Sequence, residues 1–66
     1  MKIILNGEDI DISSGFSVSD LINSFSLDVR KIAVEKNLEI VSRSKFSDEI
    51  LQENDIIEII HFIGGG

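Results

Sequence analysis

A single short amphipathic helix is the feature that most limits how this chain can fold. In the stretch SVSDLINSF, apolar residues recur at the three- and four-residue spacing of one helix face: Val18, Leu21, Ile22 and Phe25. Ser17 and Asp20 have the spacing of a capping box, which predicts that the helix begins just after Ser17. Because a helix of about two to three turns is not stable alone in water, its apolar face must pack on a sheet.

The segment before this helix predicts a β-hairpin. An Asn-Gly pair at positions 6 and 7 separates two β-branched runs, and this pair is the strongest short hairpin signal. We expect strands at Lys2–Leu5 and at residues 9–12. In the second strand isoleucine alternates with aspartate, which is typical of an antiparallel strand with one face buried.

The segment after the helix predicts three more strands, at Ile32–Lys36, residues 39–43 and residues 56–62. Between the last two, the chain is polar and irregular, and its apolar residues are expected to tether it to the core: Phe46, Ile50 and Leu51. The order β-β-α-β-β-β predicts an α+β fold, with a mixed sheet of four to five strands packed on one main helix. We expect one domain over residues 1–66, with a globular part at residues 1–62 and a flexible glycine tail at residues 63–66.

Composition excludes several classes of protein. The chain has no cysteine and one histidine, which excludes disulfides and a zinc knuckle. A net charge of −6 argues against nucleic acid as a partner, since phosphates would be repelled. No apolar run approaches the roughly 20 residues of a membrane helix, and no signal peptide is recognisable. We therefore expect a cytoplasmic protein, monomeric when free, that binds neither nucleic acid nor membrane.

Side-chain chemistry offers no convincing active site. His61 has no partner for a ligand pair and is interpreted as an ordinary strand residue. None of the serines lies in a nucleophile-elbow motif. The carboxylate pairs, including Glu8-Asp9 and the acids near Asp55, lack EF-hand spacing and are interpreted as solvated turn residues. We expect no metal and no bound cofactor.

The last strand and the glycine tail carry more information. Alternation predicts that Ile56, Glu58, Ile60 and Phe62 share the outward face of the strand, whereas Ile57, Ile59 and His61 lie on the other. Two alternatives stay open: the apolar residues of the outward face are exposed for a partner, or the segment at residues 46–51 covers them.

The glycines at the end of the chain cannot be explained by stability, because glycine is costly to order and adds no packing. One interpretation is an artificial or ragged end. The other is that the α-carboxylate of Gly66 is the functional group, presented on a thin arm to the active site of another protein. A carboxylate with a pKa of about 3.3 to 3.7 is ionised at neutral pH. It would have to be activated, for example as a mixed anhydride with the α-phosphate of ATP, before it could transfer a group.

The whole chain resembles the small sulfur carrier proteins of thiamine biosynthesis. The resemblance rests on the segments MKIILNGED, SVSDLI, IAVEKN, LEIVSRS and, most specifically, NDIIEIIHFIGGG. It implies a ubiquitin-like β-grasp fold and a carrier, not an enzyme. It also implies that an E1-like activating enzyme adenylates Gly66 with ATP. A cysteine desulfurase or another persulfide donor would then supply sulfur for a C-terminal thiocarboxylate, which serves thiazole synthase. The residues implied in partner binding are Ile60, Phe62, Ile63, Gly64 and Gly65.

Three positions depart from the pattern of that family, and all lie in loops. A turn that is usually Asn-Gly is Asn37-Leu38, a common proline is Ser42, and an aromatic position that is often tryptophan is Phe46. These differences make the geometry of the turn at Asn37-Leu38 uncertain, but they do not affect the chemistry expected at the C-terminus. Three alternative functions remain: a molybdopterin-synthase small subunit, a ubiquitin-type protein modifier, and a β-grasp interaction module without transfer chemistry.

Overall fold

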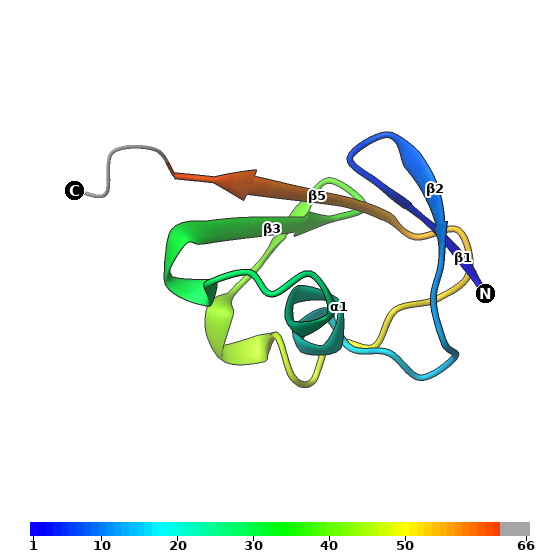
Figure 1. The fold of residues 1–66 in the computed structure, drawn as a ribbon, viewed down its shortest axis with the longest axis horizontal. Coiled ribbons are helices and arrows are strands. Elements are labelled where there is room, and N and C mark those ends of the chain that lie inside the picture. Colours follow the sequence, from blue (N-terminus) through cyan, green and yellow to red (C-terminus); the bar gives the residue numbers. More distant parts are fainter. Residues whose placement is uncertain (63–66) are drawn as a thin grey trace.

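The computed structural model describes residues 1–62, which form a five-stranded sheet with one α-helix against one of its faces (Figure 1). The elements confirm the predicted α+β order, and the tail predicted at residues 63–66 lies outside the described residues. The elements are β1 (Lys2–Leu5), β2 (Glu8–Asp11), α1 (Val18–Ser24), β3 (Ile32–Lys36), β4 (Glu39–Val41) and β5 (Ile56–His61), with 3-10 helices at Val29–Lys31 and Arg43–Lys45.

The last strand of the chain lies at the centre of the sheet. The strand order is β2-β1-β5-β3-β4, so β5 is hydrogen-bonded on both sides. It runs parallel to β1, with Ile4 opposite Ile56, and antiparallel to β3, with Val34 opposite Ile59. The sheet therefore holds the strand that leads to the C-terminal residues more firmly than an edge position would.

The capping box predicted for α1 is present. The Ser17 hydroxyl accepts a hydrogen bond from the Asp20 N–H at 3.0 Å, and the Asp20 carboxylate accepts one from the Ser17 N–H at 2.9 Å. The prediction was wrong for Phe25, which ends the helix as its C-cap and is 49% exposed. The next residue, Ser26, has a φ of 57°, so the chain turns away before Phe25 can reach the core.

The core lies between α1 and the inner face of the sheet. The segment at residues 44–55 contributes Phe46 and Leu51 to it, as predicted, but Ile50 is exposed. The predicted burial of Ile50 is wrong because this residue forms an extended bridge with Ser17. Side chains alternate in direction along extended backbone, so Ile50 points away from the core that Leu51 enters. The buried apolar side chains are Ile3, Val18, Leu21, Ile22, Ile32, Val34, Phe46, Leu51, Ile57 and Ile59.

Several strand ends differ from the predicted ones by one or two residues. Strand β2 begins and ends one residue earlier than predicted, and β5 ends at His61 instead of position 62. Strand β4 is two residues shorter, because a 3-10 helix begins at Arg43. The questioned turn between β3 and β4 has φ values of 52° at Asn37 and 72° at Leu38, so both residues are left-handed, as in a type I′ hairpin turn.

Candidate functional site

The outward face of β5 is exposed and carries apolar residues on both sides of Glu58. Ile57 and Ile59 are buried beneath α1, whereas Ile60 is 48% exposed and Phe62 is 54% exposed. The predicted division of the strand into two faces is confirmed for these residues. The alternative, that the segment at residues 46–51 covers the outward face, is wrong, because Phe46 and Leu51 pack into the core.

Neighbouring strands extend this exposed surface across the sheet. The register places Ala33 and Glu35 of β3 opposite Ile60 and Glu58, and it places Ile40 of β4 opposite Glu35. Residues directly opposite one another point to the same side of a sheet. We call this surface the outer face and define it by the exposed apolar residues and the two acids that lie between them: Ile40, Ile56, Ile60, Phe62, Glu35 and Glu58.

The exit of β5 from the sheet is fixed by backbone and side-chain hydrogen bonds. The Phe62 N–H donates to the Lys31 carbonyl at 2.9 Å. The Asn6 side chain accepts from the Ile59 N–H at 2.8 Å and donates to the Ile59 carbonyl at 3.4 Å. The sequence signal at Asn6 predicts a turn and gives no indication of this contact. The sheet thus holds the chain as far as Phe62.

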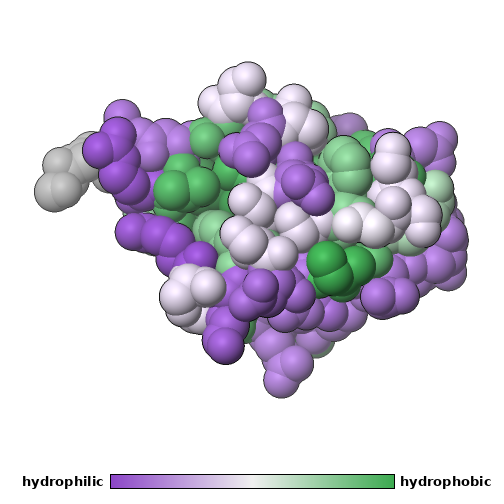
Figure 2. Space-filling model, turned by 90° about the horizontal axis from the view of Figure 1, so that it is seen from below, coloured by the Kyte–Doolittle hydropathy of each residue, from purple (hydrophilic) through white to green (hydrophobic). Residues whose placement is uncertain are grey.

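His61 is the last residue of β5, and its side chain lies on the side of the sheet that faces the helix. It is exposed and lines a shallow pocket of about 270 Å³ with apolar residues that include Leu5, Phe25 and Leu27. Figure 2 looks at this side of the molecule and shows apolar surface near the end where β5 finishes, within a largely polar surround.

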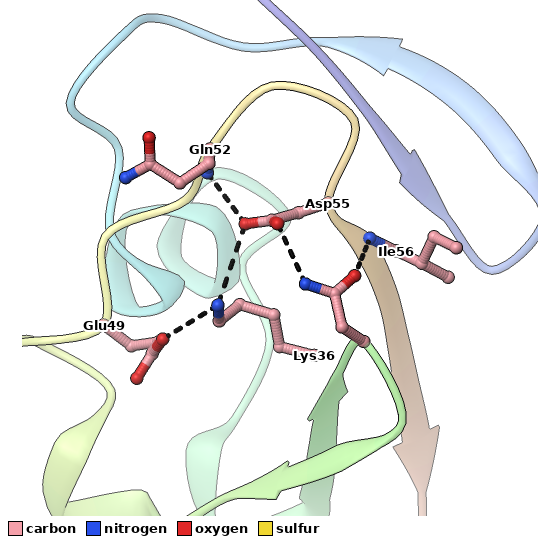
Figure 3. A network of polar contacts seen from close by, with 6 residues as sticks. Lys36, Glu49, Gln52, Asp55 and Ile56 are labelled. Atoms are coloured by element: carbon pink, nitrogen blue, oxygen red, sulfur yellow. Dashed lines mark hydrogen bonds and ion pairs between the residues drawn. The ribbon is translucent and has the colours of Figure 1, made fainter.

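The opposite end of β5 is held by a polar network (Figure 3). The Lys36 ammonium lies 3.1 Å from the Glu49 carboxylate and 3.9 Å from that of Asp55. The hydrogen bond to Glu49 raises the pKa of Lys36. Asp55 also accepts from the Gln52 N–H at 2.7 Å and from the Asn37 amide at 3.0 Å.

This network is structural. The Ile56 N–H donates to the Asn37 side chain at 2.9 Å, which fixes the first residue of β5. The interpretation of Asp55 as a solvated turn acid was wrong, because only 7% of the residue is exposed. A buried carboxylate requires several donors, and these come from two separate segments of the chain.

Residues 1–62 contain no group of three or more side chains suited to hold a metal ion. Over the same residues, no helix has the length and hydropathy needed to cross a membrane. Among the predicted site residues, Ile60 and Phe62 lie on the outer face. The others, Ile63, Gly64, Gly65 and Gly66, are outside the described residues.

Proteins of one family resemble this chain in both sequence and structure. The model of the ThiS family matches residues 3–66. The sulfur carrier protein ThiS of Bacillus subtilis is 36% identical over 63 residues, which cover 94% of this chain and 96% of that protein. The crystal structure of the thiamine biosynthesis protein ThiS from Geobacter metallireducens has a TM-score of 0.85 at 25% identity and covers both chains fully.

A longer relative also matches. The thiazole synthase of Paramagnetospirillum magneticum is 42% identical over 66 residues, and this chain spans only 20% of its length. The family match covers nearly the whole chain, and the structural match confirms the β-grasp fold that the resemblance implied. This chain therefore belongs to the ThiS family.

Proposed function

We propose that this chain is a sulfur carrier in thiamine biosynthesis and that its sulfur is carried on the terminal carboxylate of Gly66. The observation that carries the proposal is the match of the ThiS family over residues 3–66, which includes the glycine end. It is supported by the name of the Bacillus subtilis relative, a sulfur carrier protein of nearly the same length. The chain has no cysteine, so the sulfur has to be held by a group other than a thiol side chain.

The chemistry requires activation of an unreactive carboxylate. An E1-like enzyme would bind ATP, and a carboxylate oxygen of Gly66 would attack the α-phosphate to form an acyl-adenylate and release pyrophosphate. A persulfide on a cysteine desulfurase or another donor would then displace AMP and form an acyl disulfide. A thiol would reduce that disulfide and leave the C-terminal thiocarboxylate. In this scheme the chain is a co-substrate of partner enzymes, without a catalytic residue or a bound cofactor of its own.

Thiazole synthase is the proposed acceptor of the sulfur. A relative with that name contains a segment similar to this entire chain within a polypeptide about five times as long. Joining two domains in one polypeptide raises their effective concentration, which favours domains that act on one another. We propose that the thiocarboxylate transfers its sulfur to thiazole synthase, and that the exchange takes place in the cytoplasm.

The outer face is the proposed docking surface for these enzymes. Ile60 and Phe62 lie at the end of β5 that precedes the tail, and Ile63, Gly64 and Gly65 continue from them in sequence. An apolar surface that includes Glu35 and Glu58 fits an enzyme surface with an apolar centre and basic groups around it. Docking there would direct the glycine tail into the active site of the partner.

Intact-mass spectrometry tests the proposal. The chain is incubated with its activating enzyme, magnesium ATP, a cysteine desulfurase, cysteine and a thiol. We expect the mass to increase by the difference between sulfur and oxygen, with fragment ions placing the change on Gly66. A reaction without ATP is the control. If the mass is unchanged while a known carrier converts, the chain is not a sulfur carrier of this kind and an interaction module becomes the better interpretation.

A growth experiment identifies the acceptor. Cells that lack this protein should require thiazole if thiazole synthase is the acceptor. Loss of molybdenum-enzyme activity, without a thiazole requirement, would instead show a molybdopterin-synthase small subunit.

A further inference from the structure

A second apolar surface lies at the edge of the sheet, away from the outer face. A groove of about 460 Å³ runs between β2 and α1. Most of its lining is apolar, and Phe25, which fails to reach the core, is part of it. We call it the edge groove, and its lining residues are Ile10, Asp11, Ile12, Ser13, Phe16, Leu21, Ser24 and Phe25.

The strand beside this groove is an open sheet edge. Strand β2 is the first in the sheet order, and within residues 1–62 it pairs only with β1. The Ile12 N–H donates to the Met1 carbonyl at 2.8 Å, and the Met1 ammonium donates to the Ile12 carbonyl at 2.8 Å. In an antiparallel pair, alternate residues direct their backbone groups toward the partner strand. Asp9 and Asp11 therefore direct their N–H and C=O groups toward the open edge.

The side chains of β2 form an apolar side and an acidic side along this edge. Ile10 and Ile12 turn toward α1 and line the groove, whereas the side chains of Asp9 and Asp11 point to the other side of the sheet. Both aspartates are exposed, and the only ion pair that either makes within residues 1–62 joins Asp9 to Lys2 at 3.8 Å. An incoming strand would thus meet apolar groups on one side and carboxylates on the other.

We propose that the edge groove and the open edge of β2 bind an extended segment of a partner protein in which large apolar residues alternate with Lys or Arg. The segment would add a strand to the sheet and hydrogen-bond to Asp9 and Asp11. Its apolar side chains would enter the groove, and its basic side chains would lie beside the two carboxylates. A second copy of this chain does not fit, because pairing β2 with itself would bring aspartates together.

This surface is separate from the one proposed for sulfur transfer. Strand β1 lies between β2 and β5 in the sheet. None of the groove residues is among those that define the outer face, and only Asp11 of the groove has a side chain on the same side of the sheet as that face. A partner bound at the edge groove would leave Ile60 and Phe62 uncovered. The chain therefore has room to be held by one protein while another acts on its C-terminal end, and the proposal does not depend on the sulfur chemistry.

Amide chemical shifts provide the test. The ¹⁵N-labelled chain is titrated with a short capped peptide of alternating Val and Lys, and a Val and Glu peptide serves as the control. We expect the Val and Lys peptide to shift the amides of residues 9–12 and Phe25 and to slow hydrogen exchange at Asp9 and Asp11. No binding, or shifts confined to Ile60 and Phe62, would overturn the proposal.

Two modified proteins separate the charges from the edge hydrogen bonds. Replacing both Asp9→Asn and Asp11→Asn should weaken peptide affinity about three- to tenfold, while Asp48→Asn, at an exposed acid outside the groove, should not. A synthetic chain with an N-methyl group on the Asp11 nitrogen loses an edge donor and keeps the pairing with β1. It should fold and lose most of its affinity. Unchanged affinity in this folded chain would contradict strand addition.

Discussion

At the scale of single residues, the turn between β3 and β4 keeps a left-handed backbone although its second residue is a leucine. Asn37 and Leu38 both have positive φ, and Leu38 is almost fully exposed. Asparagine tolerates this conformation, but a leucine side chain strains it. The Asn37 side chain contacts both Asp55 and the Ile56 backbone, so the turn persists despite the strained leucine.

Replacing Leu38→Gly should therefore stabilise the protein by about 0.5–1 kcal/mol, since glycine adopts positive φ without a Cβ clash and only part of the gain is lost to unfolded-state entropy. Thermal unfolding should show a melting temperature about 3–6 °C higher. Leu38→Ala is the matched control, because it removes the exposed side chain but keeps the Cβ, and it should give no comparable gain. An equal gain from alanine would show that strain at Leu38 is not the cause.

A second prediction at this scale concerns Asp28. The Arg30 guanidinium donates to both carboxylate oxygens, at 3.1 and 3.0 Å, and the Arg30 N–H donates at 2.9 Å. These contacts lower the pKa of Asp28 to about 2. The ionised form therefore adds stability that is complete above pH 3.8, the ordinary pKa, and is lost as the pH falls toward 2.

In Arg30→Gln the pKa of Asp28 should rise toward its ordinary value without reaching it, because the backbone N–H remains. An NMR titration of the Asp28 carboxyl carbon measures this change. Arg43→Gln is the control, because Arg43 makes no ion pair within residues 1–62. A pKa of Asp28 that stays near 2 in Arg30→Gln would assign the shift to the backbone contact alone.

At the scale of elements, α1 is too short to be stable without the sheet. It has seven residues, and its capping box satisfies backbone groups at its first turn while Val18, Leu21 and Ile22 are fully buried. Tertiary packing and the cap thus act on the same short segment. Loss of the cap should lower the stability of the whole protein, because the core has no second α-helix within residues 1–62.

Ser17→Ala should cost about 1 kcal/mol, because the Asp20 N–H loses its acceptor. The midpoint of thermal unfolding should fall by about 4–8 °C. Ser19→Ala changes the same residue type two positions later, where the hydroxyl makes no hydrogen bond within residues 1–62. It should leave the midpoint nearly unchanged, and equal losses in the two variants would mean that the cap is not what Ser17 contributes.

At the scale of the whole molecule, β5 connects the polar network around Asp55 with the part of the outer face that precedes the glycine tail. Strand β5 runs through the sheet toward the C-terminal end of the chain (Figure 1). Its first residue is held by the network around Asp55, and Ile60 and Phe62 at its other end belong to the outer face. The central position in the sheet means that β5 cannot shift without disturbing β1 and β3. A partner that binds Ile60 and Phe62 at the end of β5 would therefore contact a strand that both of its neighbours hold in place.

A chain without Gly65 and Gly66 should keep its thermal stability within about 1 kcal/mol, because glycine has no side chain to bury. It should also fail to form a thiocarboxylate, since its terminal carboxylate would be about 7 Å short of the original reach. Intact mass after the activation reaction and thermal unfolding measure the two effects. Gly64→Ala keeps the length and serves as the control for stability. A large loss of stability on truncation would mean that the tail is structural.

The sequence by itself determined the features that depend on neighbours along the chain. The hairpin at Asn6-Gly7, the helix after Ser17 and the alternation of β5 all follow from local spacing, because backbone geometry repeats every two residues in strands and every 3.6 in helices. The outward direction of Ile60 and Phe62 follows from the same rule. Their exposure could be predicted only as one of two alternatives.

The tertiary structure alone decided what depends on distant segments. Phe25 and Ile50 have apolar side chains that suit a core, yet the local path of the chain turns them outward. Asp55 is buried because donors from β3, its following turn and Gln52 converge on it. Asn6 holds Ile59 across 53 positions of sequence. Such contacts have no signature in local spacing, because they exist only once the sheet has brought the segments together.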